Sequence, residues 1–371
     1  MNRREFLIGS AAVVGALAAG GYGFVHSDRF GRLPTGERLR RIQASPHYIN
    51  GRFECLHPVK SILKDESQAE AIYKMITADR TGWVPEQPML AEKTDLFALR
   101  PDEDCVVWMG HSTFYLQLAG KRILIDPVFS DYGAPVFFIN KAFAGSNVYQ
   151  AEDIPELDVL LMSHDHWDHL DYPTVMALKP KVKSIVCPLG VGEYFEQWGF
   201  DMTLVHEEDW DTDVDLGDGF HVHVLPSQHF SGRFLDQNQT EWCSFALTSP
   251  TRRIYLSCDG GYGDHFTAIG EQFGGFNLAI MENGQYNEQW HPIHLLPPET
   301  VQAAVDVGAK KVMLAHNSKF CLARHKWEAP MADVRELSAG KPYELLTPKI
   351  GQYVNLDAKA ADFESWWEQM V

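Results

Sequence analysis

Four side chains with metal-binding chemistry crowd into one short stretch of the sequence. His164, His166, Asp168 and His169 fall within six consecutive positions. Imidazole nitrogens and carboxylate oxygens are the ligands that Zn²⁺ and related divalent ions take from proteins. In extended backbone His164 and His166 point the same way, while Asp168 and His169 follow a turn and can face a second point. The spacing predicts two adjacent metal ions. The alternative is a polar loop whose histidines cap neighbouring elements, and the density of the motif argues against it.

The motif follows a run that can hold it in place. Residues 157–162 are apolar and rich in Val and Leu, and ligand-type residues begin directly after them. This pattern is typical of a buried strand that ends in a loop. Loops at strand ends let side chains converge on one point without each needing a partner in the core.

Three further metal-capable residues close apolar, strand-like runs in the same way. They are His229, Asp259 and His316. Any one of them alone would more often be an ordinary polar residue at a strand end. Together with the histidine cluster, the repeated pattern predicts that all three converge on one rim of a sheet.

The form H-x-H-x-D-H resembles the signature of the metallo-β-lactamase superfamily. Gly110-His111-Ser112-Thr113 and Asp126-Pro127 further resemble the branch of N-acyl-phosphatidylethanolamine-hydrolysing phospholipase D and ascorbate-6-phosphate lactonase. The resemblance covers roughly residues 105–356. It implies an α/β (α+β) fold, namely an αββα sandwich of two mixed β-sheets flanked by helices. The metal site is then expected at one edge between the sheets.

The resemblance also implies a division of the ligands between two ions. One ion takes His164, His166 and His229, the other takes Asp168, His169 and His316, and Asp259 bridges them. Each ion then keeps an open position, as catalytic metals do. Two ions about 3.5–4 Å apart can share a water and lower its pKa, so the expected nucleophile is a bridging hydroxide. The expected cofactors are two divalent ions, Zn²⁺ first, with Mn²⁺ or Fe²⁺ as alternatives.

Other residues are expected around this site. Asp126 and His111 are candidates for orienting a metal-bound imidazole, with strand-end hydrogen bonding as the alternative. His294 aligns with a histidine near the active site of the phospholipase family. Asp168 and His294 are the predicted catalytic residues. His294 is expected to donate a proton to a leaving group, and helix capping is the alternative role for His294. Four other histidines are interpreted as surface or structural residues: His206, His221, His223 and His325.

The sequence departs from the phospholipase pattern at three places. Cys258-Asp259-Gly260-Gly261 stands at the bridging aspartate, and Asn317-Ser318-Lys319 follows the last metal histidine. The run Met281-Glu282-Asn283-Gly284-Gln285-Tyr286 is polar where the phospholipase is apolar. The expected metal ligands therefore transfer from the family, but the substrate pocket does not.

The remaining core alternates strand-like and helix-like runs, which indicates sheets covered by helices. Further strands are expected at residues 105–110, 113–118, 122–128, 184–188, 220–226, 242–248, 254–258, 278–281 and 311–315. Helices are expected at residues 172–178, 191–198, 266–273, 297–307 and 358–370.

The first 26 residues resemble a bacterial twin-arginine signal. Arg3-Arg4 is followed by Phe6-Leu7 and a mildly apolar run to about Gly23. Export to the periplasm is therefore expected, with an uncleaved membrane anchor as the alternative. Residues 27–102 are interpreted as a polar, irregular N-terminal extension with one helix at residues 66–78. Residues 103–371 form the hydrolase domain.

The composition of the chain argues against some classes of binding partner. The chain has 371 residues, a net charge of −18 and 45% hydrophobic residues, so it can bury a large core but repels phosphate backbones. Nucleic acid is therefore not an expected partner. The six cysteines form no C-x-x-C pair, which argues against a cysteine zinc site.

These observations favour a dinuclear metal hydrolase. The leading hypothesis is a phosphodiesterase that acts on a phospholipid-like substrate, in the manner of the phospholipase D that the chain resembles. A lactonase or another ester or amide hydrolase of the same fold is the alternative, and a non-catalytic metal-binding or scaffold protein is the alternative of another class. The expected partners are a small-molecule or lipid substrate and, through peripheral association, a membrane.

Overall fold

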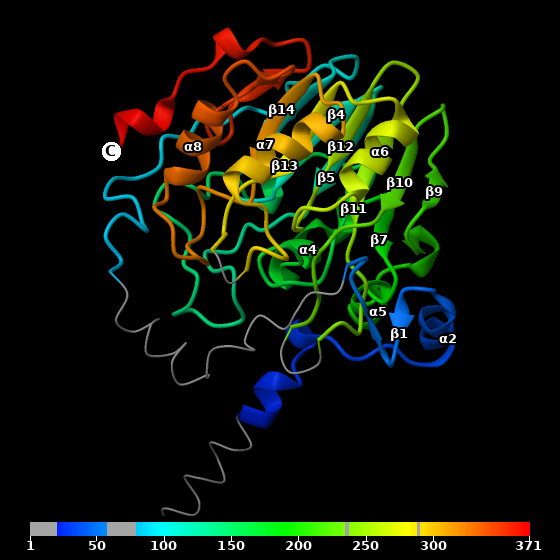
Figure 1. The fold of residues 1–371 in the computed structure, drawn as a ribbon. Coiled ribbons are helices and arrows are strands. Elements are labelled where there is room, and N and C mark those ends of the chain that lie inside the picture. The colour runs from blue at the N-terminus through cyan, green and yellow to red at the C-terminus, as the bar shows by residue number, and fades with distance from the viewer. Residues whose placement is uncertain (1–20, 58–78, 234–236, 288–289) are drawn as a thin grey trace, which may run out of the picture.

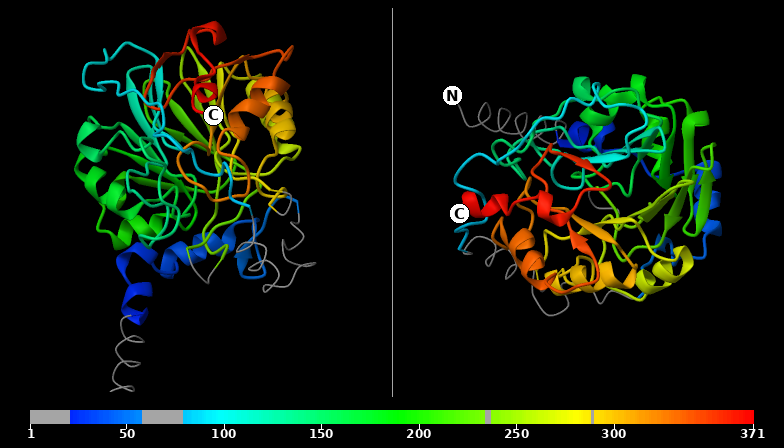
Figure 2. Two further views of the ribbon diagram at one scale, coloured as in Figure 1. Left: turned by 90° about the vertical axis from the view of Figure 1, so that its left-hand side faces the viewer. Right: turned by 90° about the horizontal axis from the view of Figure 1, so that it is seen from above.

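A computed structural model describes residues 21–57, 79–233, 237–287 and 290–371. Two seven-stranded mixed sheets face each other and helices cover their outer faces (Figures 1 and 2). The predicted αββα sandwich is confirmed. The helix expected at residues 66–78 and most of the signal-like segment lie outside the described residues. Among the helices that are described, none is long and apolar enough to cross a membrane.

The first sheet contains the strand that leads into the histidine motif. In sheet order its strands are β16 (Tyr353–Asn355), β3 (Cys105–Trp108), β4 (Phe114–Leu118), β5 (Lys121–Ile125), β6 (Val159–Leu161), β7 (Ile185–Pro188) and β8 (Val205–Glu208). Pairing is antiparallel from β16 to β5 and parallel from β5 to β8. The chain therefore enters the motif from a central, parallel strand.

The second sheet repeats this arrangement. In sheet order its strands are β15 (Glu344–Leu345), β14 (Lys311–Ala315), β13 (Leu278–Glu282), β12 (Arg253–Leu256), β11 (Ser244–Thr248), β10 (His221–Leu225) and β9 (Thr212–Asp215). β12 to β15 are parallel, and β9 to β12 are antiparallel. As a consequence β10, β12, β13 and β14 all run in the same direction.

Helices complete the two outer layers. Figure 2 shows α4 (Tyr172–Leu178) and α5 (Gly192–Gln197) on the first sheet's side. On the other side are α6 (His265–Phe273), α7 (Pro297–Asp306) and α8 (Ala329–Leu337). The short 3-10 helices are η1 (Asp28–Phe30), η2 (Ala151–Asp153), η3 (Lys179–Lys181), η4 (Met202–Leu204), η5 (Ala360–Asp362) and η6 (Trp366–Gln369).

The strands are apolar on both faces because both faces are buried. Successive side chains on a strand point to opposite sides. Val106 packs in the core between the sheets, and its neighbour Val107 packs in the core under α4 and α5. Such strands appear in the sequence as continuous apolar runs rather than as alternating patterns.

The N-terminal extension is more ordered than its polar sequence predicted. It contains α2 (Gly36–Ala44) and a hairpin of β1 (Tyr48–Ile49) and β2 (Arg52–Phe53). Phe53 is buried, and its N–H donates to the carbonyl of Asn238. Tertiary contacts hold these short elements, and local sequence patterns do not reveal such contacts.

The helix predicted at residues 358–370 is wrong. The segment instead has the two short turns η5 and η6. Trp366 and Trp367 are both buried, and the Trp366 indole N–H donates to the carbonyl of Pro348. Adjacent residues of an α-helix lie about 100° apart, so a terminal helix on the surface could not readily bury both rings.

Candidate metal centre

The sandwich topology brings six strand ends to one rim. In the first sheet β5 leads to Asp126 and β6 leads to the motif. In the second sheet the parallel orientation of β10, β12, β13 and β14 carries four residues to the same edge. They are His229, Asp259, Glu282 and His316. The rim between the two sheets therefore collects the predicted ligands.

Three imidazoles form the first cluster. His166 Nδ1 lies 2.9 Å from His164 Nε2 and 3.2 Å from His229 Nε2. Three nitrogens that share one zinc ion at 2.0–2.1 Å in a tetrahedron would lie about 3.3 Å apart. The observed spacing is close to that edge.

Neighbouring groups decide which nitrogen of each ring carries a proton. Ser163 Oγ donates to Asp126 Oδ2 over 2.6 Å, so His164 Nδ1 donates to Ser163 Oγ over 2.8 Å. His229 Nδ1 donates to the carbonyl of Ile293 over 3.1 Å. The Nε2 lone pairs of both rings are then free to face His166. Outer partners that fix the tautomer in this way are typical of metal-ligating histidines.

Burial keeps these three rings neutral. It lowers the pKa values of His164 and His229 well below the usual value, and neighbouring imidazoles lower them further. Burial also lowers the pKa of His166 to about 4, although the nearby carboxylates of Asp165 and Asp168 oppose it. A neutral imidazole has the free lone pair that a metal ion needs.

A second cluster lies beside the first. Asp168 Oδ2 is 3.4 Å from His316 Nε2 and 3.7 Å from His169 Nε2. Asp259 Oδ2 lies 3.1 Å from each of these two nitrogens. The same oxygen is 3.7 Å from His229 Nε2 and 3.9 Å from His164 Nε2. Asp259 therefore lies between the clusters, where the resemblance placed a bridging ligand.

The second cluster carries a strong demand for positive charge. Burial alone would lower the pKa of His169, but Asp259 and Asp168 outweigh it and raise that pKa well above the usual value. At His316 burial is likewise outweighed, by Asp259, Asp168 and Glu282 together, and the pKa rises to about 10. The pKa values of Asp168 and Asp259 stay well below the usual value because the histidine charges outweigh burial. A divalent cation would supply this charge.

The residues fit two divalent ions. His169 Nδ1 donates to Asp126 Oδ2 over 2.9 Å, so His169 Nε2 is the nitrogen that faces Asp259 Oδ2, 3.1 Å away. The other oxygen, Asp259 Oδ1, is buried and has no hydrogen-bond partner within the described part of the chain. A buried carboxylate among imidazole nitrogens calls for positive charge, which either protons on the histidines or a bound divalent ion can supply.

Asp126 and His111 both belong to the shell around the ligands. Asp126 orients His169 as expected, and its other oxygen accepts from the N–H of Ser163 over 2.8 Å. His111 instead contacts a carboxylate, because its Nε2 donates to Asp168 Oδ2 over 2.8 Å. Here the structure differs from the expectation that His111 orients an imidazole.

Three of these residues have backbone angles that non-glycine residues rarely adopt. The φ angles are +53° at His111, +41° at Asp126 and +65° at His316. Left-handed conformations carry a conformational cost and often occur at functional sites. Each of these three residues therefore combines a left-handed backbone conformation with a side chain that lies at the rim.

Glu282 is a site residue that the sequence analysis did not assign. Its carboxylate is fully buried at the end of β13. Oε1 accepts from His294 Nδ1 and lies 3.4 Å from His316 Nδ1, and Oε2 accepts from the N–H of Leu295 over 2.9 Å. The sequence could have identified Glu282, because it ends an apolar strand in the same way as the predicted ligands do.

His294 reaches the rim through this pair. Its ring lies 5.1 Å from the ring of His229 and stacks on His316 at 5.3 Å, measured between centroids. Because Nδ1 is held by Glu282, Nε2 is the nitrogen that can face a substrate. The four histidines interpreted as surface or structural make contacts away from this cluster where contacts are described. His325 Nε2, for example, accepts from the N–H of Gln285.

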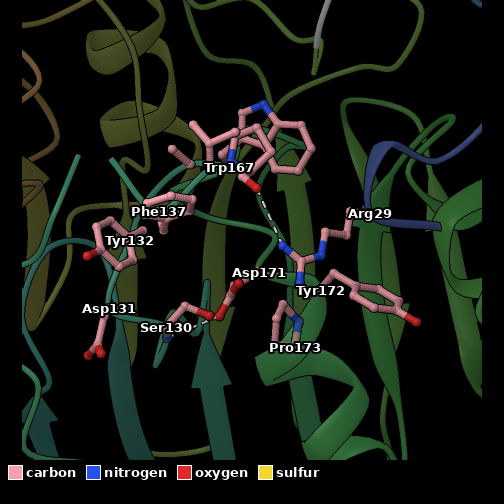
Figure 3. Close-up of a pocket in the computed structure, with 12 residues that line it drawn as sticks. Arg29, Ser130, Asp131, Tyr132, Phe137, Trp167, Asp171, Tyr172 and Pro173 are labelled. Atoms are coloured by element: carbon pink, nitrogen blue, oxygen red, sulfur yellow. Dashed lines mark hydrogen bonds between the residues drawn. The ribbon is translucent and has the colours of Figure 1, made fainter. Parts of the chain in front are cut away.

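A cavity of about 270 Å³ lies beside the motif. Figure 3 shows Trp167, Tyr132 and Phe137 around it, with Arg29 on the opposite side. Trp167 sits between two ligand residues of the motif, His166 and Asp168. Trp167 therefore connects the cavity to the motif, and none of the seven ligand-type residues is among the residues that line it.

Comparison with known proteins agrees with this geometry. A family model described as "Beta-lactamase superfamily domain" matches residues 121–317. An uncharacterized protein of Mycobacterium tuberculosis is 34% identical over 331 residues, which are 88% of each chain. The mitochondrial N-acyl-phosphatidylethanolamine-hydrolyzing phospholipase D of Saccharomyces cerevisiae is 33% identical over 261 residues, 66% of this chain and 54% of the yeast protein. Igni18, a metallo hydrolase of Ignicoccus hospitalis, superposes with a TM-score of 0.52 at 16% identity, over 68% of this chain and 97% of Igni18.

The two facing mixed sheets, together with the imidazoles and carboxylates at their rim, place this chain among the metallo-hydrolases that have an αββα sandwich. The chain belongs to the metallo-β-lactamase superfamily. The resemblance of its histidine motif predicted this family.

Proposed function

We propose that this protein is a phosphodiesterase that uses two divalent ions, Zn²⁺ first, to hydrolyse a phospholipid-like substrate. The observation that carries the proposal is the convergence of seven ligand-type side chains in two buried clusters that share Asp259. The 33% sequence identity to the N-acyl-phosphatidylethanolamine-hydrolyzing phospholipase D of yeast supports a phosphodiester as the substrate.

Each cluster has a distinct role in the proposal. His164, His166 and His229 would hold one ion, and Asp168, His169 and His316 the other. When bound, the two ions supply a water of lowered pKa and polarise the phosphoryl oxygen of the substrate. Asp126 and Ser163 keep the histidine lone pairs directed inward, and His111 holds the carboxylate of Asp168.

The proton for the leaving group would come from the chain. Attack by water forms a new P–O bond, and the P–O bond to the leaving alcohol breaks. The leaving oxygen takes a proton from Nε2 of the protonated His294, the attacking water passes one of its protons to solvent, and solvent then reprotonates His294. Glu282 holds the opposite nitrogen, Nδ1, so it is a positioning residue for His294.

Metal content and turnover test the proposal together. The purified protein should contain close to two divalent ions and should cleave a phosphodiester or an N-acyl phospholipid in a panel that also includes lactones. His166→Ala and Asp259→Ala should lower the metal content and abolish turnover. His221→Ala is the matched control, because His221 lies on β10 and pairs with Asp213 on the neighbouring strand.

Each other outcome points to a different function. Turnover of lactones alone would favour a carboxylic ester hydrolase, since the same activated water attacks a carbonyl carbon. Metal binding without turnover of any substrate in the panel would favour a scaffold protein. Full occupancy and turnover in both variants would show that the site is assigned to the wrong residues.

A further inference from the structure

The loop between β5 and β6 carries an exposed apolar tip, Pro135-Val136-Phe137-Phe138-Ile139, here called the apolar tip. Phe137 is 76% exposed, Phe138 is 71% exposed and Ile139 is 46% exposed. The two rings contact each other edge to face at 5.4 Å. Nowhere else in the described residues are three consecutive large apolar side chains exposed in this way. Soluble surfaces rarely present such a run without a partner.

The apolar tip stands on an ordered base. The N–H of Gly133 donates to the carbonyl of Asn140 over 2.9 Å, and the N–H of Ala142 donates to that of Asp131 over 2.8 Å. Tyr132 and Lys141 pair as an antiparallel bridge. The chain therefore forms a closed hairpin that projects its end outward.

The base of this hairpin touches the metal centre. A Cβ placed on Gly133 would lie 3.3 Å from Cβ of Asp168, so this backbone packs directly against a predicted ligand. Phe137 also lines the cavity beside Trp167 (Figure 3). A surface that receives the apolar tip would therefore lie close to the loop that carries the histidine motif.

The N-terminal segment leaves the protein beside the same hairpin. Arg29 Nη1 donates to the carbonyl of Pro135 over 3.4 Å, and the ring of Phe30 packs on Trp167 at 4.9 Å. Tyr22 and Phe24, further upstream, are 67% and 39% exposed. The sequence before them continues as the apolar run that resembles a signal or anchor. Within the described residues, Phe24 contacts Phe30 at 5.2 Å between ring centroids, so exposed apolar side chains of the N-terminal segment lie near the hairpin as well.

Charge distinguishes among surfaces that could receive the tip. The protein as a whole has a net charge of −18, but residues 133–140 contain no charged side chain. An uncharged apolar tip with aromatic rings suits the interface of a bilayer, where Phe and Ile enter the headgroup boundary. The acidic remainder disfavours a strongly anionic surface.

From these observations we infer that the apolar tip inserts into a zwitterionic phospholipid bilayer and thereby presents the metal centre to the membrane surface. The inference names a bilayer as the partner of the site described above. It rests on the proposed function only in assuming that a reaction takes place at that site. Membrane docking does not require that a phosphodiester be the bond that is cleaved.

A fluorescent reporter at the tip tests the inference in the full chain. Phe138→Cys is labelled with an environment-sensitive fluorophore and mixed with phosphatidylcholine–phosphatidylethanolamine vesicles, some of which contain a spin-labelled quencher lipid. Phe97→Cys is the matched control, because Phe97 is 60% exposed outside the hairpin. Parent protein treated with the same reagent corrects for labelling of its native cysteines. The label at residue 138 should shift to the blue and be quenched, and the label at residue 97 should not.

A second variant measures how much the tip contributes. Phe138→Ser with Ile139→Ser should weaken vesicle binding by about tenfold or more, because two apolar side chains no longer enter the boundary. Turnover of a water-soluble phosphodiester and the metal content should remain those of the parent. Failure of the proposed function would instead appear as absent turnover in every variant, with or without vesicles.

Several results would overturn the inference. One is vesicle binding without any response of the label at residue 138, which would show that the N-terminal run binds alone. Equal responses at residues 138 and 97 would show nonspecific adsorption. A response that depends on protein concentration without vesicles would assign the tip to a second copy of the chain.

Discussion

The chemistry of individual residues is decided by the groups directly behind them. Asp126 accepts from both His169 and Ser163, and Ser163 in turn accepts from His164. Through these hydrogen bonds the one buried carboxylate of Asp126 orients the imidazoles of His169 and His164. Orientation of this kind commonly accounts for 10–100-fold in metal affinity.

Glu282 and His294 give the prediction at the residue scale. If His294 protonates the leaving group, His294→Ala should lower kcat by about 10²–10⁴ for a phosphodiester with a poor leaving group. Nitrophenolate leaves without protonation, so the loss on its ester should be much smaller. Glu282→Gln should give the same contrast in weaker form, because it keeps the shape but removes the charge that holds Nδ1.

The readout is the ratio of kcat losses on the two substrates, with metal content measured in parallel. His291→Ala is the control, because His291 lies three residues away on an exposed part of the same segment and pairs with Glu299. Equal losses on both substrates would assign His294 to substrate or loop positioning. No loss on either would leave it a structural residue.

At the scale of the elements, the N-terminal extension packs against the loop of the histidine motif, and Arg233 connects the two. Arg233 is buried; it donates from Nε to the carbonyl of Asp165 and from Nη1 to that of Arg29. Its guanidinium lies over the rings of Trp167 and Tyr194. Gly31, at φ +73°, passes so close to the Tyr194 ring that a side chain would collide with it. The extension is thus packed onto the loop that holds the ligands.

Arg38 of α2 gives the prediction at the element scale. Its guanidinium pairs with Glu193 and, over 2.9 Å, with Glu207, whose side chains are only 2% and 5% exposed. Arg38→Met would leave Glu193 with the half-exposed Arg32, and Glu207 with Arg41 at 3.7 Å. Removing one partner of a fully buried ion pair costs about 3–5 kcal/mol of unfolding free energy, and because these second arginines remain, the loss should lie below about 3 kcal/mol.

Chemical denaturation followed by tryptophan fluorescence checks this expectation. Arg40→Met is the control from the same helix, because Arg40 is 73% exposed and its ion-pair partner among the described residues is the equally exposed Glu37. A surface pair of that kind contributes little. Similar unfolding free energies for the two variants would show that the extension is not held by the Arg38 cluster.

The whole molecule has a net charge of −18 and also buries a carboxyl, Glu241, that has no ion pair among the described residues. Burial raises the pKa of Glu241 well above its usual value, and the nearby carboxylate of Asp209 raises it further. The backbone N–H of Glu241 donates to the carbonyl of Leu189 over 2.7 Å, and its side chain is fully buried. The folded state therefore holds a proton here that the unfolded chain releases.

The sign of the pH dependence follows from this raised pKa. Stability from the protonated carboxyl is fully present below the unfolded pKa and is lost as the pH rises toward the folded pKa. Glu241→Gln stays neutral, so its Tm should exceed that of the parent near pH 8, and the difference should shrink toward pH 5. Glu271→Gln, on the exposed face of α6, is the control. A Tm difference that does not depend on pH would contradict the expectation.

What the sequence determined by itself was local. The run of ligand-type residues at 164–169 and the strand ends at His229, Asp259 and His316 are spelled out in consecutive positions, so the family and the expected ligands followed from them. The signal-like N-terminus is equally local, but residues 1–20 lie outside the described structure and export stays a prediction.

Only the tertiary structure decided which groups stand behind the ligands. Glu282 reaches His294 and His316 from different elements, and His111 meets Asp168 across 57 positions of sequence. Helix and strand periodicity say nothing about such partners, because they depend on how two sheets face each other. The same reason explains the C-terminal helix that did not form: burial of Trp366 and Trp367 against the body outweighed a local helical pattern.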